Sequence, residues 1–552
     1  MSIGTNEVLS GISISPGLAA GRAFVFEDIL ERDLLDCEIG ADEVDKECMR
    51  CERAIAKVLV DLSLSADRVE QELEAGVGDI FRAHEEMLRD LALIGEIRAE
   101  IEKGLVKSEC ALKRVLGRWE RKFRTMGNDL LEQRGDDIAD LARRLLRSLA
   151  GLQSHSLERM PKGSILVARK LLPSDTVFFS RRSVRGVVVE RGGPGSHCAL
   201  LTRQLGIPGV SRVTGLLDRV ATGDLLLLDG LRGTVTIRPD QPGLTEFRSR
   251  KGRYYSGERA AKKLSNLPAV TRDGVAVPVM ANIGNRHDAE TAAGNGADGI
   301  GLFRIEIFFM ARTMLPDEEE LVAGMSKAID PMKGKPVSIR LLDIGGDKQL
   351  PYLSLPSESD PFLGRRGVRF LLDYPDYLDL QLRALLRLSR EHDVRIIVPM
   401  VTTVDDMRKV RVALVRVGSK LGFGTLPPLG AMVETPAAAL CASEIAGVSD
   451  FLNIGSNDLT QYTMAAGREN SYVSRYFRDD HPAVFRLLKI VCSEAHGISV
   501  GLCGELAGRC PLVNALLGTG IGILSVPPPL VPAVKEAVRG CSTDVESVRR
   551  ND

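Results

Sequence analysis

The C-terminal half of the chain repeats one pattern eight times: a short apolar run followed by a stretch with helical spacing. From residue 277 onward the apolar runs are VPVMANI, GIGLFRIE, VSIRLLDIGGD, VRIIVPMV, LGAMVETP, FLNIGSND, ISVGLCGEL and IGILSVP. Eight strand–helix units in about 275 residues match the number and size of a (β/α)8 barrel. We therefore predict a TIM-type barrel in this half of the chain.

Polar residues gather at the ends of these apolar runs. They are Arg304 and Glu306, Arg340 and Asp343, Glu434, Asn457 and Asp458, and Cys503 and Glu505. Barrel enzymes build their active sites at the C-terminal ends of the strands. One arginine at a strand end is more often an ion-pair partner, but so many polar side chains on one face indicate an active site.

The residue types at these strand ends point to a small anionic substrate. Four arginines would surround one pocket with planar guanidinium groups, which suit phosphate and carboxylate alike. They are Arg304, Arg340, Arg366 and Arg468. Glu434 and Asp458 add hard oxygen ligands, two per metal, as is usual for Mg2+ when substrate and water fill the other positions.

Cys503 lies between glycines in GLCGEL, which leave its side chain accessible. A thiol has a reference pKa of about 8.5, so Cys503 could donate a proton or act as a nucleophile at neutral pH. A cysteine in an apolar strand is more often a small core residue. Its place among the other polar strand ends favours a role in the site.

The first half of the chain alternates between strand-type and helix-type segments. Residues 9–26 and 163–238 contain short β-type runs such as RGVVVE and DLLLLDG, whereas residues 40–150 carry apolar residues at three- and four-residue spacing. The simplest arrangement is one small α/β domain interrupted by a helical insertion. The predicted fold class is therefore multidomain α/β, with a helical linker leading to the barrel.

The stretch GGPGSHCALLTRQLG, residues 192–206, is a glycine-rich turn that runs into a helix with His197 at the junction. The N–H groups and positive dipole end of a helix N-terminus attract phosphate. An imidazole at this point could attack a phosphoryl group and form a phosphoramidate. A lone histidine is more often a cap or a buried hydrogen-bonding residue, but a phosphate-type barrel on the same chain favours the nucleophile.

Charge and hydropathy exclude several classes of protein. The net charge of −1, from 73 basic and 74 acidic residues, gives no electrostatic case for nucleic acid. The uncharged residues 511–534 are interrupted by prolines and glycines, so we expect no membrane insertion. With no signal peptide and a single CxxC pair, Cys48 and Cys51, we expect a cytoplasmic protein with reduced thiols and no zinc site.

Seven motifs carry a family resemblance: GGPGSHCALLTRQLGIP, GLFRIEIFFM, DIGGDKQLPYL, PFLGRRGVR, MVETPAAA, IGSNDLTQYTMAAGREN and GLCGELAG. They resemble Enzyme I of the bacterial phosphoenolpyruvate:sugar phosphotransferase system, and the likeness runs through most of the chain. Pyruvate phosphate dikinase and phosphoenolpyruvate synthase share the swivelling histidine domain and the barrel. Those enzymes also carry a large ATP-grasp domain, for which this chain has no room.

The resemblance implies a role for each candidate residue. Phosphoenolpyruvate would phosphorylate His197, and Cys503 would protonate the pyruvate enolate at C3. Mg2+ would bind to Glu434 and Asp458. The residues implied to hold the substrate are Arg304, Arg340, Arg366, Asn457, Asp458 and Arg468.

The resemblance also implies a domain order and partners. The helical insertion would dock HPr or an HPr-like phosphocarrier, with His84, Met87 and Leu88 kept in its docking helix. The family generally dimerises through the barrel, so we expect a homodimer. The phosphohistidine swivelling domain is expected in two parts, 1–30 and 153–243, with the docking insertion between them at 31–152. A helical linker is expected at 244–268 and the phosphoenolpyruvate-binding barrel at 269–552.

Several features depart from the family pattern, among them Gly467 and Glu469 on either side of Arg468, and Arg82 and Arg89 in the docking helix. Gly195 stands where the family usually has a threonine, and Ile305 stands where it has another. The chain is also expected to lack the family's terminal helix, which bears on dimerisation. None of these changes removes a charged catalytic residue, so we expect activity.

The sequence leaves the physiological role open. A phosphotransferase that starts sugar uptake and a regulatory relay that signals carbon or nitrogen status would carry the same residues. A small-molecule phosphoenolpyruvate mutase or lyase would leave both His197 and the helical insertion without a purpose.

Overall fold

The protein is described by a computed structural model and consists of two compact units, Met1–Tyr255 and Ser256–Asp552. The structure describes residues 6–26, 28–31, 37–72, 84–125, 129–152, 156–172, 175, 179, 183–192, 197–310, 314–345, 350, 352–353, 356, 358–467, 473 and 475–542.

A mixed sheet forms the centre of the N-terminal unit. Its strands are β1 (Glu7–Ser10), β2 (Ile12–Ser15), β3 (Leu18–Val25), β4 (Ile165–Ala168), β5 (Gly186–Val189), β6 (Gly209–Ser211), β7 (Leu225–Asp229) and β8 (Thr234–Ile237), in the order β1-β8-β7-β3-β4-β5-β6-β2. Successive residues of β4 and β5 enter two different core clusters, because side chains of a strand alternate between the faces of a sheet. The prediction of an α/β domain is confirmed.

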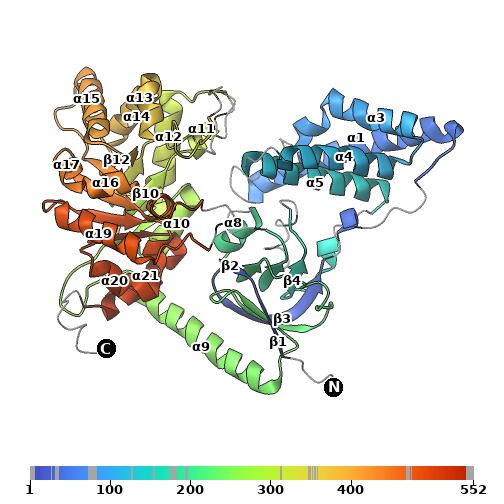
Figure 1. Cartoon of the computed structure of the whole chain (residues 1–552), viewed down its shortest axis with the longest axis horizontal. Helices are drawn as coiled ribbons and strands as arrows, with labels where there is room; N and C mark the ends of the chain where they lie inside the picture. The colour runs from blue at the N-terminus through green and yellow to red at the C-terminus, as the bar shows by residue number, and fades with distance from the viewer. Residues whose placement is uncertain are drawn as a thin grey trace. The chain divides into compact units, whose positions relative to one another are not determined.

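Among the described residues between β3 and β4, four long helices are present (Figure 1). They are α1 (Val44–Glu72), α3 (Leu91–Gly104), α4 (Ser108–Thr125) and α5 (Asp129–Leu149). Their apolar residues meet in one core, in which Leu112, Val115 and Leu141 are fully buried. The three- and four-residue spacing therefore predicted this helical segment correctly.

Two of the three residues that mark the expected docking helix are buried. His84 is fully buried, and its Nε2 lies 3.1 Å from Oδ1 of Asp137. Leu88 is buried in the helical core, and only Met87 is partly accessible. His84 and Leu88 therefore pack inside the helical segment.

Cys37 and Cys110 form a disulfide with their Cα atoms 5.9 Å apart. The expectation of reduced thiols throughout was therefore wrong for this pair. The segment of Cys37 runs beside the start of α4, where Ile39 N donates to Leu105 O at 2.9 Å and Lys107 N donates to Cys37 O at 2.8 Å. The two cysteines are 73 residues apart in the sequence and are brought together by the tertiary fold, so no local sequence motif predicts the disulfide.

Arg143 joins the helical insertion to the sheet domain. It lies on α5 and is 2% exposed. Its guanidinium donates to both oxygens of Asp28, which follows β3, and its Nη1 donates to Oδ2 of Asp175 at 2.5 Å. The ring of Phe26 lies 5.2 Å from the guanidinium carbon, within range of a cation–π contact.

The C-terminal unit is a closed barrel of eight parallel strands, ringed by helices (Figure 1). The strands are β9 (Val279–Ile283), β10 (Ile300–Arg304), β11 (Val337–Arg340), β12 (Val394–Val401), β13 (Leu429–Val433), β14 (Phe451–Gly455), β15 (Val500–Cys503) and β16 (Ile523–Val526). Each falls within one of the eight predicted apolar runs. The predicted barrel is confirmed.

The helices around the barrel follow the strands in sequence. They are α10 (Arg286–Gly294), α11 (Ile307–Met310), α12 (Glu318–Ile329), α13 (Val368–Asp373), α14 (Pro375–Leu388), α15 (Val404–Lys420), α16 (Pro436–Leu440), α17 (Ala442–Ala446), α18 (Ser456–Met464), α19 (Pro482–Glu494), α20 (Val513–Leu517) and α21 (Val531–Gly540). Among the residues that the structure describes, no helix is long and apolar enough to cross a membrane.

The helix α9 (Gln241–Lys263) lies where a helical linker was expected. The segment after it is held by the last helix, α21. Lys535 is fully buried there and donates to Ser265 O at 3.0 Å and to Gly296 O at 2.6 Å. Arg539 donates to Leu264 O at 2.8 Å, so α21 fixes the start of the barrel unit.

Candidate functional site

Several of the predicted site residues lie at the C-terminal ends of the barrel strands. Arg304 and Arg340 are the last residues of β10 and β11 and face each other in register. Cys503 ends β15 and pairs with Gly455. Glu434 directly follows β13.

The first turn of α18 carries Asn457 and Asp458, directly after β14. The Oδ1 atom of Asn457 accepts a hydrogen bond from Glu505 N at 3.0 Å, which joins this turn to the segment after Cys503. All these residues therefore come from one face of the barrel, the face on which barrel enzymes carry their active sites.

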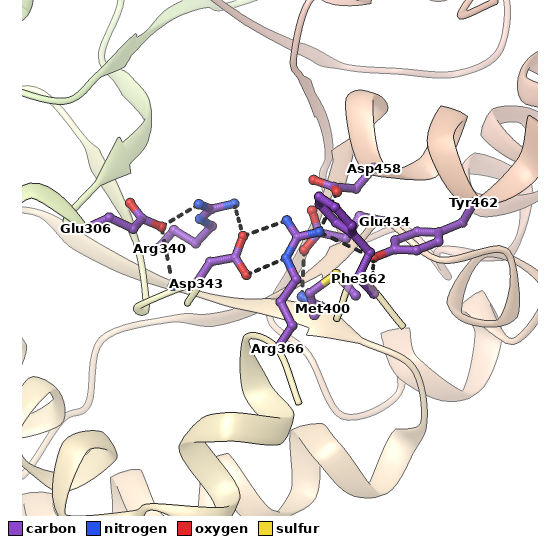
Figure 2. Close-up of polar contacts among 9 residues, drawn as sticks. All are labelled: Glu306, Arg340, Asp343, Phe362, Arg366, Met400, Glu434, Asp458 and Tyr462. Carbon is purple, nitrogen blue, oxygen red and sulfur yellow. Dashed lines mark hydrogen bonds and ion pairs between the residues drawn. The ribbon is translucent and has the colours of Figure 1, made fainter. Parts of the chain in front are cut away.

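Arg340 is buried and shared by two carboxylates (Figure 2). Its Nη2 donates to Oε1 of Glu306 at 2.5 Å, and its Nη1 lies 3.2 Å from Oδ2 of Asp343. Burial lowers the pKa of Arg340, but the carboxylates of Glu306 and Asp343 outweigh this effect and raise it above its usual range. The guanidinium therefore stays charged although it is shielded from water.

Arg366 lies on the other side of Asp343 (Figure 2). Its Nε and Nη2 donate to the two oxygens of Asp343 at 3.1 and 3.0 Å, and its Nη1 donates to Oδ1 of Asp458 at 2.7 Å. Nη1 also lies 3.3 Å from the hydroxyl of Tyr462, which itself donates to Phe362 O at 2.6 Å. Asp343 thus contacts both buried arginines.

Glu434 is 1% exposed, and its Oε1 accepts a hydrogen bond from Met400 N at 2.6 Å. Met400 has φ 55°, a left-handed conformation that is uncommon for a residue with a side chain and is often found at functional sites. Burial, followed by the carboxylates of Asp458 and Asp343, raises the pKa of Glu434 to about 8. A positive charge in addition to Arg340 and Arg366 would relieve this repulsion.

The donor set around Glu434 and Asp458 fits a divalent cation. Both side chains offer hard oxygen atoms, and their mutual repulsion is one cause of the raised pKa of Glu434. A Cβ on Gly455 would lie 2.6 Å from Oε2 of Glu434, so a glycine is needed for the carboxylate to reach this position. Among the described residues no three His, Cys, Asp or Glu side chains converge as a metal site, so water and substrate would complete the coordination.

Cys503 is 2% exposed, and its thiol donates to Ile454 O at 3.4 Å. Burial, and to a smaller extent the charge of Glu434, raises the pKa of Cys503 to about 12. The sulfur therefore keeps its proton at neutral pH. Of the two roles left open by the sequence, this environment favours the proton donor over the thiolate nucleophile.

The remaining predicted residues have different outcomes. His197 is the first residue of α8 (His197–Gln204), as the glycine-rich turn predicted, but its side chain lies outside the described residues. Arg468 and Gly195 also lie outside them. Ile305 is buried in the barrel core, so it offers no polar group in place of the expected hydroxyl.

Two contacts at the site were not predicted from the sequence. Met400 contributes its backbone N–H, which no side-chain pattern reveals. Tyr462 did leave a signal, because it follows Asp458 by four residues on α18 and such residues share a helix face.

Three family descriptions match successive parts of the chain. They are "PEP-utilising enzyme, N-terminal" over residues 10–134, "PEP-utilising enzyme, mobile domain" over 160–233 and "PEP-utilising enzyme, PEP-binding domain" over 258–543. The last of these covers the barrel and every strand-end residue described above.

Curated relatives match nearly the whole chain. A phosphoenolpyruvate-protein phosphotransferase of Bacillus sp. (strain S) is 36% identical over 529 residues, which cover 94% of this chain and 91% of the relative. The protein of that name from Geobacillus stearothermophilus is 37% identical with the same coverage. That from Haemophilus influenzae is 36% identical over 540 residues, 96% of this chain and 94% of its own length.

Proposed function

Because the chain belongs to the phosphoenolpyruvate-protein phosphotransferase family, we propose that it transfers the phosphoryl group of phosphoenolpyruvate to His197. From His197 the group would pass to HPr or an HPr-like carrier, as the first step of a sugar phosphotransferase system. One observation carries the proposal: two buried arginines, Arg340 and Arg366, share Asp343 beside Glu434 and Asp458.

The arginines of the barrel mouth would bind the two anionic groups of the substrate. Guanidinium groups make charge-assisted, often bidentate hydrogen bonds to phosphate and carboxylate. Arg340 and Arg366 are already fixed by Asp343, so they lose little freedom when substrate binds. Arg304, the register partner of Arg340, is exposed and would extend the same positive surface, with Asn457 and Arg468 as further contacts.

Charge on the transferring group needs neutralisation. A Mg2+ ion held by Glu434 and Asp458 would stabilise that charge as it develops. Arg340 and Arg366 would act in the same direction as fixed positive charges in a buried site. Because burial and neighbouring carboxylates raise the pKa of Glu434, the bound cation itself would be needed to keep it as a carboxylate, and the hydrogen bond from Met400 N would orient its Oε1.

The reaction would then consist of one phosphoryl transfer, followed by two proton transfers. The phosphorus–oxygen bond of phosphoenolpyruvate breaks, and a phosphorus–nitrogen bond forms at His197. The enolate that leaves takes a proton at C3 from Cys503 and becomes pyruvate. Solvent returns a proton to the sulfur, and the pKa of about 12 favours this return.

The proposed function also requires a role for each of the other domains. His197 has to reach both the substrate and the carrier, so its domain would swivel about the segments that join it to its neighbours. The helical insertion would dock the carrier, and the barrel would form the homodimer. Each of these roles is assigned to one of the expected domains.

The decisive experiment uses phosphoenolpyruvate labelled with ³²P, with Mg2+ present. The wild-type protein should acquire an acid-labile, base-stable label, and the His197→Ala variant should not. His287→Ala, which removes an exposed histidine of α10, is the matched control and should be labelled like the wild type. Equal labelling of His197→Ala would disprove the mechanism. Addition of purified HPr should then remove the label from the wild type.

A further inference from the structure

Asp458 already has a cationic partner in this structure. Nη1 of Arg366 donates to its Oδ1 at 2.7 Å, on the same carboxylate that would bind the metal (Figure 2). We propose that Arg366 stands in for the divalent cation: it neutralises Asp458 while the metal is absent and releases it when the metal binds. The freed N–H would then be available to a phosphoryl oxygen. The inference rests on the proposed function, because it presumes that Asp458 is a metal ligand.

The two edges of the Arg366 guanidinium are held differently. The edge formed by Nε and Nη2 makes a bidentate pair with Asp343, whose side chain has no exposed surface. Nη1 instead contacts Asp458, whose side chain is 22% exposed. A cation arriving from solvent can therefore reach Asp458 but not Asp343. The first contact anchors the arginine, and the second is the one that can exchange.

Tyr462 would keep Nη1 in place after the exchange. Its hydroxyl donates to Phe362 O at 2.6 Å, which turns an oxygen lone pair toward Nη1 of Arg366 at 3.3 Å. Phe362 belongs to the segment that leads to Arg366, and Tyr462 lies one helical turn after Asp458. Tyr462 is thus a positioning residue that ties the arginine to the helix carrying Asp458.

The balance of charge explains why a stand-in is needed. Asp343 and Asp458 both contact Arg366, and Glu434 lies next to them at the strand ends (Figure 2). A carboxylate left without a partner in such a place is costly, since unpaired buried charges destabilise a protein strongly. Arg366 lowers that cost at Asp458 without occupying the metal position permanently.

The test measures Mn2+ binding without substrate, from the electron paramagnetic resonance signal of free Mn2+. Arg366→Met should bind Mn2+ about tenfold more tightly than Arg340→Met. Arg340→Met is the matched control, because it removes one buried positive charge that contacts Glu306 and Asp343 but not Asp458. Equal affinities of the two variants, or weaker binding by Arg366→Met, would overturn the inference.

Two further variants complete the test. If Arg366→Met does not fold, as judged by circular dichroism, Arg366→Lys is compared with Arg340→Lys, and the same order with a smaller difference is expected. Tyr462→Phe should raise KM for phosphoenolpyruvate several-fold with little change in kcat, whereas equal losses in both would contradict a positioning role. Since Mn2+ binding needs no phosphoryl transfer, failure of the stand-in is distinguishable from failure to label His197.

Discussion

Arg143 in the N-terminal unit and Arg366 in the barrel are both buried guanidinium groups shared by two aspartates. Arg143 pairs with Asp28 and Asp175, and Arg366 pairs with Asp343 and Asp458. The pKa of each arginine is raised by its carboxylates despite burial. A buried arginine between two acids is therefore not by itself the mark of an active site.

The surroundings of the two clusters differ. Arg143 joins α5 to the end of β3 and to the segment after β4, and the ring of Phe26 covers it. At the barrel mouth, Glu434 lies beside the cluster with its pKa raised to about 8. Burial and the carboxylates of Asp458 and Asp343 cause this rise, and Arg340 and Arg366 offset it only in part. Crowded carboxylates at the strand ends, rather than a buried arginine alone, therefore distinguish the candidate site from the Arg143 cluster.

Two buried cysteines, one in the barrel and one in the N-terminal unit, also differ in their expected roles. Replacing the barrel cysteine should have the largest effect on the reaction rate. Burial raises the pKa of both Cys503 and Cys198 to about 12. Cys503→Ala should slow pyruvate formation by about 10²- to 10⁴-fold, the usual loss when a general acid is removed. Cys198→Ala removes a core thiol of α8 and should leave the rate close to that of the wild type. Pyruvate release from labelled phosphoenolpyruvate measures both, and equal effects would contradict the contrast.

Removing Arg143 tests whether its cluster serves stability. Arg143→Met leaves Asp28 and Asp175 without their cation and should lower the free energy of unfolding of the N-terminal unit by about 3–5 kcal/mol. Arg114→Met, which breaks an exposed pair with Glu100, should cost no more than about 1 kcal/mol. Urea unfolding of the full chain compares them. If Arg143→Met kept its stability but could not be phosphorylated, the two clusters would not differ as argued.

Alkylation of thiols tests the pH behaviour of the two buried cysteines. A raised pKa favours the protonated thiol, so the reactive thiolate is scarce below pH 12 and increases about tenfold with each pH unit. At pH 8, a pKa of about 12 makes Cys503 and Cys198 roughly three orders of magnitude less reactive than an ordinary thiol. Mass spectrometry after iodoacetamide treatment measures each site, with exposed Cys441 as internal reference. Cys503 reacting as fast as Cys441 at pH 8 would be inconsistent with its environment.

The disulfide gives the smallest expected effect and touches only one region. Cys37 and Cys110 close a loop with a separation of 73 residues, so reduction should destabilise the helical insertion by about 2–4 kcal/mol. The unfolding transition of the barrel should not change. Thermal unfolding with and without dithiothreitol measures the difference, and Cys37→Ser should be insensitive to the reductant. A shift in the barrel transition instead would show that the two units are not separate in stability.

Much of the fold could be predicted because its signals are local. Each barrel strand is a short apolar run, so periodicity placed all eight, and β12 matches its predicted run, VRIIVPMV, from end to end. The short strand β6 was missed, and β1 begins two residues before the predicted β-type segment 9–26. Each has three or four residues and depends on pairing with distant strands, β8 and β2 respectively.

The candidate site divides in the same way. The positions of Arg340, Glu434 and Cys503 could be predicted, because the end of each apolar run in the sequence marks the end of a strand. Spacing alone could not show that Asp343 holds two arginines or that Arg366 contacts Asp458, because these contacts join residues 23 and 92 positions apart. The Cys37–Cys110 bond is a further case in which tertiary pairing decided the chemistry.

We expect the barrel mouth to bind phosphoenolpyruvate independently of His197, the histidine proposed to accept its phosphoryl group. Calorimetric titration with phosphoenolpyruvate and Mg2+ tests it most directly in the His197→Ala variant, in which no transfer should take place. We expect that variant to bind phosphoenolpyruvate, and the added substitution Arg340→Met to weaken binding by about 100-fold, as loss of a buried charged contact does. Absence of binding by His197→Ala, or unchanged binding after Arg340→Met, would contradict the account.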